Sequence, residues 1–344
     1  MTKLNWGIIG LGSIAQKFSE AFAEANNSKL LAVASRNYQK LDNFKKKFNI
    51  EEKFLFKNYE DLINCKDVDI IYIALPNSLH HSWIIKSIKN NKNVLVEKPA
   101  TLNFEEAKNI KQSLSNKDLF FGEAFMYRHH PQIAHVLNMI HNNEIGNLTS
   151  MESSFGINIL TKKKFLFFEK KKKINKEDRK FNKKLGGGCT LDLGCYPTSF
   201  SLLIGSLFNK TNKNSIKLLN SENKIGETEV DIDSKGELLF ENGFKSKIRA
   251  SFEKNLGGKS IIRGENGHIV INNTWKGNDK VFLIKENKSK VKNFDDNKNI
   301  YSYQIEQTSN NILNGKNEAS YPGMSLDETL LNMKIIEEWL NVQK

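Results

Sequence analysis

Residues 4–15 read LNWGIIGLGSIA, and this stretch decides the fold of the first part of the chain. Its apolar segment Leu4–Ile9 has the length and composition of a short strand. Gly10 and Gly12 follow directly, and apolar residues at helical spacing then continue through Ser13–Ala25. A strand, a glycine turn and a helix in immediate succession predict the first β-α unit of a larger sheet.

The same alternation of strand and helix continues as far as Phe121. The further predicted strands are Leu30–Ala34, Val68–Leu75, Val94–Val96 and Leu119–Phe121, and the further predicted helices are Tyr38–Phe48, Ser82–Asn90 and Asn103–Ser115. Val68–Leu75 is a nearly unbroken apolar run, which is typical of a strand buried on both faces. Repeated β-α-β units require a parallel, doubly wound sheet with right-handed crossovers. We therefore predict an α/β protein whose N-terminal domain, residues 1–122, is of this type.

The pattern changes in the second part of the chain, which we predict as one further domain, residues 123–344. A predicted helix, Pro131–His141, comes first, because proline suits the first helical turn. The predicted strands alternate apolar and polar residues, and they are Leu148–Asn158, Val230–Phe240, Phe244–Phe252, Lys259–Arg263 and Gly267–Ile271. Glu241-Asn242-Gly243 is a hairpin signal. With helices at Gly194–Gly205 and Ser325–Asn341, this part is predicted to be an α+β domain with an open, mostly antiparallel sheet.

The chain is basic, with 52 Lys and Arg against 39 Asp and Glu in 344 residues. Such a charge can serve binding to nucleic acid, a membrane surface or an anionic substrate. The dense basic runs are Lys162–Lys164 and Lys170–Lys173, which lack the aromatic interleaving of a single-strand groove and fit no helix-turn-helix or finger pattern. We interpret them as a solvated loop and expect no nucleic-acid partner. No apolar run is long enough to span a bilayer, so we expect no membrane partner either.

The cysteines and the N-terminal sequence bear on the cellular compartment. Cys65, Cys189 and Cys195 are odd in number and contain no C-x-x-C pair, so neither a disulfide framework nor a zinc site is indicated, and no metal is expected. The first predicted strand begins almost at Met1, which leaves no room for a signal peptide. A cytoplasmic location is therefore the expectation.

Gly10, Gly12 and Ala15 form the pattern G-x-G-x-x-A at the turn from the first strand into the first helix. Gly10 permits the tight turn, Gly12 lets a pyrophosphate approach the backbone, and Ala15 allows the helix to pack closely on the strand. The helix N-terminus offers N–H groups to the phosphates, so Ser13 and Ile14 are also expected to take part. In this context the pattern predicts a Rossmann site for a nicotinamide dinucleotide, and a purely structural glycine turn is the alternative.

The end of the second strand distinguishes between the two nicotinamide cofactors. It reads Ala34-Ser35-Arg36-Asn37 and lacks the carboxylate that NAD-specific sites usually place there for the ribose 2′-hydroxyl. Ser35 can donate to a 2′-phosphate, and Arg36 can pair with it and stack on adenine. We therefore predict NADP as the cofactor. The alternative is that Arg36 is only a surface charge and that NAD binds as well.

Two further segments follow parallel strands at the edge where such sheets bind ligands. The first contains Leu75, Pro76, Asn77 and His80, and the second is Glu97-Lys98-Pro99. We predict that Leu75, Pro76, Asn77, His80, Glu97 and Lys98 contribute to the cofactor site. A lysine at this edge can orient a substrate oxygen and stabilise a developing alkoxide, so Lys98 is also a catalytic candidate. Taken alone, it would more often be a surface residue.

These motifs resemble those of a known family when they are combined with a segment of the second half. That segment, residues 185–197, reads LGGGCTLDLGCYP. Together the motifs resemble the glucose–fructose oxidoreductase / inositol dehydrogenase family. Residues 123–132, EAFMYRHHPQ, are similar to its branch of NADP-dependent aldose (xylose) dehydrogenases and trans-dihydrodiol dehydrogenases. The resemblance implies hydride transfer between a carbinol C–H and the nicotinamide, on a sugar, polyol or cyclic diol. It also implies a second sheet used for contact in a homodimer or homotetramer.

The resemblance carries over to three residues with catalytic roles. Lys98 matches the family's active-site lysine, Asp192 its substrate-binding aspartate, and Tyr196 its acid/base position. Asp192 and Tyr196 are four residues apart, so they can share one face at the start of a helix. Whether Lys98 or Tyr196 takes the proton stays open. A core tyrosine and a helix-capping aspartate are the alternative.

The chain departs from the family pattern in the lysine-rich segment 159–176, which leaves the substrate open. Arg128, His130 and Arg179 are candidate substrate contacts, with structural roles equally compatible. Two other functions compete with the leading one. One is a keto-sugar reductase acting on a phosphorylated or nucleotide-linked sugar, and the other is a cofactor-binding regulator without catalysis.

Overall fold

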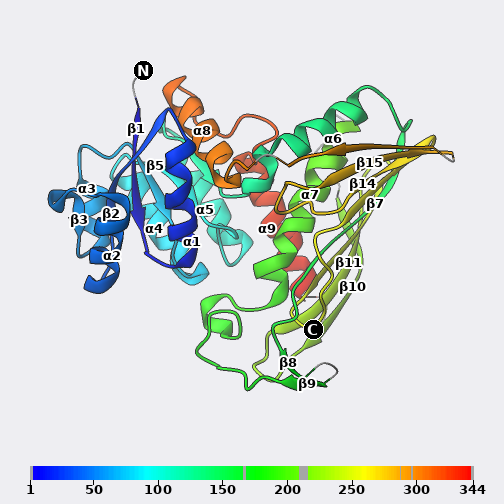
Figure 1. Cartoon of the computed structure of the whole chain (residues 1–344), viewed down its shortest axis with the longest axis horizontal. Coiled ribbons are helices and arrows are strands. Elements are labelled where there is room, and N and C mark those ends of the chain that lie inside the picture. Colours follow the sequence, from blue (N-terminus) through cyan, green and yellow to red (C-terminus); the bar gives the residue numbers. More distant parts are fainter. Residues whose placement is uncertain (1–2, 166–167, 209–215, 287, 296, 342–344) are drawn as a thin grey trace. The chain divides into compact units, whose positions relative to one another are not determined.

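The computed structural model describes residues 3–165, 168–208, 216–286, 288–295 and 297–341. The chain divides into two compact units (Figure 1). The first consists of Met1–His130 with Asn297–Leu330, and the second of Pro131–Asp296 with Leu331–Lys344. These units do not coincide with the predicted domains 1–122 and 123–344, because the chain returns to the first unit near its end.

The first unit is built on a six-stranded sheet with the strand order β3-β2-β1-β4-β5-β6. Its strands are β1 (Leu4–Ile9), β2 (Ser28–Ala34), β3 (Leu55–Phe56), β4 (Ile70–Ile73), β5 (Asn93–Val96) and β6 (Phe121–Glu123). Every neighbouring pair is parallel. The order reverses at β1 and β4, as in a doubly wound dinucleotide-binding sheet. The predicted fold class of this part is confirmed.

Helices follow the strands of the first sheet, and all of the α-helices below except α3 were predicted. They are α1 (Ser13–Glu20), α2 (Tyr38–Phe48), α3 (Tyr59–Asn64), α4 (Asn77–Lys89) and α5 (Phe104–Leu114), with 3-10 turns η1 (Ala21–Glu24) and η2 (Glu52–Phe54). Asn37 and Asn103 cap α2 and α5, because their side chains accept hydrogen bonds from backbone N–H groups of the first turn. Helix α4 begins five residues earlier than predicted. Its N-terminus therefore lies within the Leu75-Pro76-Asn77 segment.

A helix near the C-terminus, α8 (Ile300–Leu313), completes the first unit and was not predicted. The indole N–H of Trp6 in β1 donates to Ser309 Oγ at 3.0 Å, and Asn27 Nδ2 donates to Glu306 O at 2.9 Å. The buried residues of α8 are mostly polar: Ser302, Gln304, Ile305, Thr308, Ser309 and Asn311. Apolar periodicity cannot find a helix whose buried face is polar.

The second unit contains an eight-stranded sheet with the order β10-β11-β12-β7-β13-β14-β15-β16. Its strands are β7 (Leu148–Gly156), β10 (Lys217–Ile225), β11 (Asp231–Leu239), β12 (Lys245–Ser251), β13 (Ser260–Gly264), β14 (Gly267–Ile271), β15 (Lys280–Lys285) and β16 (Lys288–Asn293). All pairs are antiparallel except β7 with β12, which confirms the open, mostly antiparallel sheet. Strands β10, β15 and β16 were not predicted. Strand β16, KSKVKN, is exposed along its whole length and has no buried face to set a pattern.

One face of this sheet is covered by helix α7 (Cys195–Gly205), which continues from a π-helical turn, η5 (Thr190–Gly194) (Figure 1). The hydroxyls of Ser201 in α7 and Ser246 in β12 lie 2.6 Å apart. The remaining helical elements of the chain are α6 (Pro131–His141), α9 (Leu326–Asn341) and the 3-10 turns η3 (Met126–His129), η4 (Lys183–Leu185) and η6 (Ser206–Phe208). Trp339 of α9 donates its indole N–H to Lys235 O of β11 at 2.8 Å.

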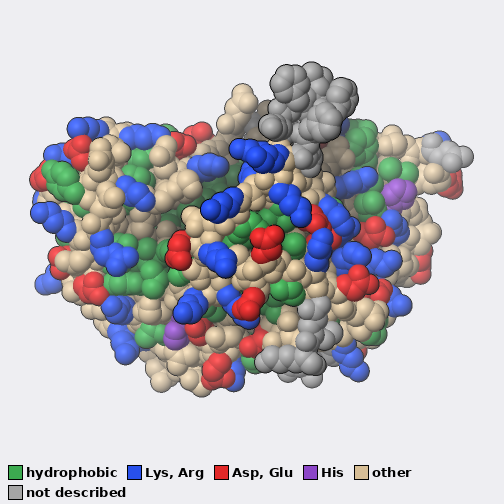
Figure 2. Space-filling view, turned by 90° about the horizontal axis from the view of Figure 1, so that it is seen from below, with side chains coloured by type: hydrophobic (Ala, Val, Ile, Leu, Met, Phe, Trp, Pro, Cys, Tyr) green, Lys and Arg blue, Asp and Glu red, His purple; other side chains and the backbone are tan. Residues whose placement is uncertain are grey.

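The lysine-rich segment is not the solvated loop that its composition predicted. Residues Thr161–Phe165 and Phe168–Lys171 form an antiparallel two-stranded sheet, β8 and β9, and Lys172 N donates to Leu160 O at 2.7 Å. Backbone pairing thus organises a segment whose side-chain charges alone suggested a loop. On the face of the molecule in Figure 2, Lys and Arg side chains are interspersed with Asp and Glu. Among the described residues, no helix combines the length and apolar character needed to cross a bilayer.

Substituting Ser309 by alanine tests how strongly α8 contributes to the first unit. The Trp6 indole N–H would remain buried without its acceptor, which should lower the free energy of unfolding by about 1–3 kcal/mol. Ser115→Ala is the matched control, since Ser115 is exposed and its hydroxyl only donates to Gln112 O in its own turn. Urea denaturation of both variants measures the difference, and equal stabilities would contradict the role given to α8.

Candidate functional site

The turn between β1 and α1 has the shape that a pyrophosphate requires. Gly10 has φ +89°, and a Cβ atom there would lie 2.6 Å from Ala74 O. Gly12 has the opposite environment, because a Cβ there would meet no atom within 4 Å. No side chain of the described residues caps the N-terminus of α1, so the N–H groups at Ser13 and Ile14 are available to an anion. The open approach at Gly12 fits a dinucleotide.

Ser35 and Arg36 directly follow β2 at the same edge of the sheet. Ser35 is buried, and its Oγ accepts a hydrogen bond from Asn37 N at 3.1 Å. Arg36 is exposed, with its guanidinium carbon 5.8 Å from the centre of the Tyr59 ring. The hydroxyl of Ser35 keeps its proton for a further acceptor, and the Arg36 charge is displayed to solvent.

His80 connects the two loops that follow β4 and β5. It is fully buried, and its Nδ1 and Nε2 atoms each lie 2.8 Å from a carbonyl oxygen, of Pro99 and Leu75 respectively. These contacts fix the loops relative to each other, so His80 organises the site predicted for the cofactor. Asn77 is the first residue of α4 and is also buried.

Glu97 and Lys98 lie at the end of β5. The Tyr72 hydroxyl donates to Glu97 Oε1, and the Tyr72 ring stacks on Phe18 of α1 with 3.7 Å between ring centres. Glu97 is thereby held in the buried layer between strand and helix. Lys98 is half-buried and precedes a cis peptide bond to Pro99.

Glu123, the last residue of β6, is a buried carboxylate that the sequence analysis did not single out. Its Oε1 accepts a hydrogen bond from Ala100 N and its Oε2 one from the Thr329 hydroxyl, both at 2.9 Å. Burial raises the pKa of Glu123 to about 7, against the opposing effects of these hydrogen bonds and of the charges on Arg128 and Lys98. A glutamate two residues after the predicted apolar strand Leu119–Phe121 was the signal that could have found it.

Asp192 and Tyr196 occupy one continuous helical stretch in the second unit, formed by η5 and α7. Arg179 Nη1 donates to Asp192 Oδ1 at 3.3 Å. The side chain of Asp192 is 11% exposed, whereas that of Arg179 is 49% exposed. Tyr196 packs edge-on against Phe155 of β7, with 5.2 Å between ring centres, and lies beside Trp275. Asp192 and Tyr196 thus lie about one helical turn apart, and each is held by neighbouring side chains.

Asp231 of β11 holds the glycine-rich segment that leads into η5. Its Oδ2 accepts hydrogen bonds from Thr190 N at 2.6 Å and from Cys189 Sγ at 3.1 Å. A Cβ atom on Gly188, which has φ +116°, would lie 2.1 Å from Asp231 Oδ1. Only glycine therefore allows the carboxylate to approach this turn. The sequence analysis did not identify Asp231, because its partners are about forty positions away in the chain.

Two family models match the chain. One, described as an oxidoreductase family with an NAD-binding Rossmann fold, matches residues 4–125, and the other, the GFO/IDH/MocA C-terminal domain, matches residues 133–270. The chain belongs to the GFO/IDH/MocA family. The resemblance derived from the motifs is confirmed, and with it the assignment of the chain as an oxidoreductase with a Rossmann domain for a nicotinamide cofactor.

Several relatives are similar to this family member over nearly their whole length. The chain is 26% identical over 344 residues to the trans-1,2-dihydrobenzene-1,2-diol dehydrogenase of Xenopus tropicalis, covering 97% of this chain and 96% of the relative. The fold of this chain matches that of the aldose-aldose oxidoreductase of Caulobacter crescentus with a TM-score of 0.84 at 21% identity, covering 98% of this chain and 96% of the other. The 3-ketoreductase KijD10 of Actinomadura kijaniata, solved with NADP and TDP-benzene, matches with a TM-score of 0.82 at 21% identity and the same coverage.

The three predicted substrate contacts have different environments in this GFO/IDH/MocA protein. Arg128 is fully buried, and its Nη1 lies 3.0 Å from Glu328 Oε1 and 3.3 Å from Pro322 O. His130 is buried against the Tyr303 ring. These contacts are consistent with structural roles for Arg128 and His130, which the sequence had left as one alternative. Arg179 is exposed beside Asp192, so a substrate contact remains the prediction for this residue.

Substituting Asp231 by alanine tests whether it holds the turn before Asp192. The Thr190 N–H would be left buried without an acceptor, so we expect the free energy of unfolding to fall by about 1–3 kcal/mol. Asp231→Asn keeps an acceptor oxygen and should retain part of the stability. Thermal denaturation of the two variants provides the comparison, and an alanine variant as stable as the unaltered protein would show that Asp231 is dispensable.

Proposed function

We propose that this protein transfers a hydride between NADP and a hydroxyl or carbonyl carbon of a sugar, polyol or cyclic diol. The observation that carries the proposal is in the first unit, where an anion-accessible turn at Gly12 and the half-buried Lys98 follow strands of one parallel sheet. Parallel strands end at the same edge, which is where such sheets bind their ligands. The named relatives are a diol dehydrogenase, an aldose-aldose oxidoreductase and a 3-ketoreductase, which supports this substrate class.

The bound nicotinamide would supply the acceptor or donor of the hydride, and the chain must then handle one proton. In the oxidative direction, the substrate C–H bond breaks with its electron pair, and the hydroxyl proton passes to a base of the protein. We propose Lys98 and Tyr196 as one proton-handling unit, because a phenol becomes an effective base at neutral pH only when a cation stabilises the phenolate. Asp192 would accept hydrogen bonds from substrate hydroxyls, with Arg179 holding its carboxylate.

Kinetics of the Lys98 and Tyr196 variants test this chemistry. Lys98→Ala or Tyr196→Phe should lower kcat by about 10²–10⁴, the usual contribution of positioned acid–base catalysis, and should leave NADP binding largely intact. The double variant should be little worse than the poorer single variant, since the two residues act together. Asp192→Asn should mainly raise KM. A Lys98→Ala variant with near-full turnover on a verified substrate would overturn the mechanism.

The preference for NADP is tested at Arg36, whose exposed charge would face a 2′-phosphate. Arg36→Ala should weaken NADP binding by about 1.5–3 kcal/mol and affect NAD much less, because a charge-assisted hydrogen bond is lost only with the phosphate. Lys29→Ala is the matched control, as Lys29 is an exposed cation at the opposite end of β2. Titration of each variant with both cofactors measures the effect. Equal losses for NADP and NAD would refute the assignment.

Two alternatives remain distinct from this proposal. A reductase acting on a phosphorylated or nucleotide-linked keto sugar is favoured by one observation, the exposed guanidinium of Arg179 beside Asp192, which could pair with a phosphate. A regulator that binds the cofactor without catalysis is opposed by the presence of Lys98, Asp192 and Tyr196 together. A panel of aldoses, diols and nucleotide-linked keto sugars with NADP or NADPH, followed by nicotinamide absorbance, distinguishes all three.

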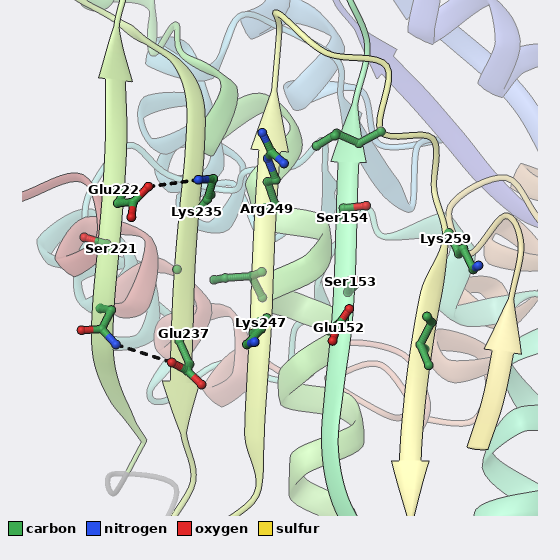
Figure 3. A pocket seen from close by; sticks show the side chains of 15 residues that line it. Glu152, Ser153, Ser154, Ser221, Glu222, Lys235, Glu237, Lys247, Arg249 and Lys259 are labelled. Carbon is green, nitrogen blue, oxygen red and sulfur yellow. Dashed lines mark hydrogen bonds and ion pairs between the residues drawn. The ribbon is translucent and has the colours of Figure 1, made fainter. Parts of the chain in front are cut away.

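The uncovered face of the eight-stranded sheet is the surface we propose for self-association. A hollow of about 550 Å³ there is bordered by charged side chains of both signs, including Glu152, Glu222, Lys235, Lys247 and Arg249 (Figure 3). Such a surface can complement a second copy of itself through opposite charges.

A symmetric homodimer or homotetramer formed through this charged face should dissociate as salt concentration rises. Sedimentation at micromolar concentration is expected to show the oligomer in low salt and a larger monomer fraction in 1 M salt. Monomer alone under both conditions would refute the proposal. A cytoplasmic location is part of the same proposal, and it is supported by the free thiols of Cys65, Cys189 and Cys195.

A further inference from the structure

Glu123 connects the loop of Lys98 to the C-terminal part of the first unit. Ala100, whose N–H donates to Glu123 Oε1, lies two residues after Lys98. Thr329, whose hydroxyl donates to Oε2, lies in α9. Glu123 is only 5% exposed, so its carboxylate reaches both partners through the buried interior.

The main chain after Lys98 is held at two successive residues by buried groups. His80 Nδ1 lies 2.8 Å from Pro99 O, and Glu123 accepts the N–H of Ala100 at 2.9 Å. Fixing the backbone on the C-terminal side of a lysine restricts where its side chain can begin. A functional side chain keeps a productive geometry only when groups behind it are held in this way.

Two cations act on the Glu123 carboxylate, Arg128 and, with a smaller effect, Lys98. Arg128 and Lys98 both favour the ionised form of Glu123, while burial opposes it and leaves the pKa of Glu123 at about 7. Arg128, however, already forms an ion pair with Glu328 of α9 at 3.0 Å. Burial and the Arg128 charge lower the pKa of His129 to about 4, so this ring adds no charge at neutral pH. The remaining contacts of Glu123, from Ala100 and Thr329, come from neutral groups.

Electrostatic coupling between two groups is mutual, so the influence of Lys98 on Glu123 has an equal counterpart. We infer that Glu123 is a positioning residue for Lys98: it anchors the loop through Ala100, and its carboxylate sets how strongly Lys98 holds its proton. The inference rests on the proposed function only in taking Lys98 as the catalytic lysine. With Glu123 ionised, the Lys98 ammonium is stabilised, and with Glu123 protonated this stabilisation is lost.

Competitive acetylation with acetic anhydride, read at Lys98 by mass spectrometry over a pH series, tests the inference without any turnover. Only the free amine reacts, so the midpoint of labelling reports the proton affinity of Lys98. Glu123→Gln keeps an oxygen for the Ala100 N–H and removes the charge. Its labelling midpoint should therefore move to lower pH by about 0.5 or more. Glu318→Gln, the same change at an exposed glutamate in the segment that pairs with β6, should leave the midpoint unchanged.

Kinetics on a verified substrate provide the second readout. Glu123→Gln should shift the pH profile of kcat in the same direction as the labelling midpoint. Glu123→Asp keeps the charge but is one methylene shorter, so it should lower kcat about 10-fold or more through the loosened loop, with little change in KM or in NADP affinity. A merely structural glutamate would leave the labelling midpoint and the pH profile where they are.

A folded Glu123→Gln protein with an unchanged labelling midpoint would overturn the inference. If the Glu123 variants do not fold, Thr329→Val decides: it removes one of the two hydrogen bonds that hold the Glu123 carboxylate, so kcat should fall several-fold with little change in KM or in NADP affinity. An unchanged kcat in that variant would then overturn the inference. Failure of the proposed function has a separate signature, since a protein that turns over no sugar or diol still reports the labelling midpoint.

Discussion

The parallel strands of the first unit end at the same level of the sheet. The position of every residue at the ligand-binding edge of the sheet depends on this alignment. Ala74 N donates to Ile9 O, Glu97 N to Ile73 O and Ala124 N to Val96 O, at 2.8–3.0 Å. Each hydrogen bond joins the first residue beyond one strand to the last residue of its neighbour. The parallel register therefore brings the glycine turn, the Leu75 segment and the Lys98 loop to one edge before any side chain contributes.

Buried side chains then hold the loops at this edge in place. His80 and Glu123 lie behind the loop of Lys98, and Tyr72 holds Glu97 against the first helix. In the second unit Asp231 has the corresponding task for the turn before Asp192. In both units, a buried polar side chain holds the backbone next to a residue that we propose for the active site. This arrangement is common where a functional geometry must be held against thermal motion.

The sequence was sufficient for the features that local pattern controls. Strand and helix alternation predicted the parallel sheet, and the G-x-G-x-x-A and Glu-Lys-Pro motifs located the residues at its edge. Asp231, Glu123 and the polar helix α8 were missed for one reason: their importance comes from partners far along the chain, such as Trp6 with Ser309. The lysine-rich hairpin was misjudged because backbone pairing outweighed side-chain charge there.

The first unit is assembled from two chain segments separated by residues 131–296 of the second unit, and this has a consequence for biosynthesis. The Trp6 indole reaches its acceptor 303 positions later, and Glu123 reaches Thr329 206 positions later. During translation the ribosome must therefore produce nearly the entire chain before the earliest strand can complete its buried contacts. The second unit shares this dependence, because its residues 331–344 are also made last and Trp339 donates to Lys235 O. The N-terminal sheet, although synthesised first, is consequently completed only after synthesis reaches the C-terminal segment, and until then its exposed apolar surface is open to chaperones.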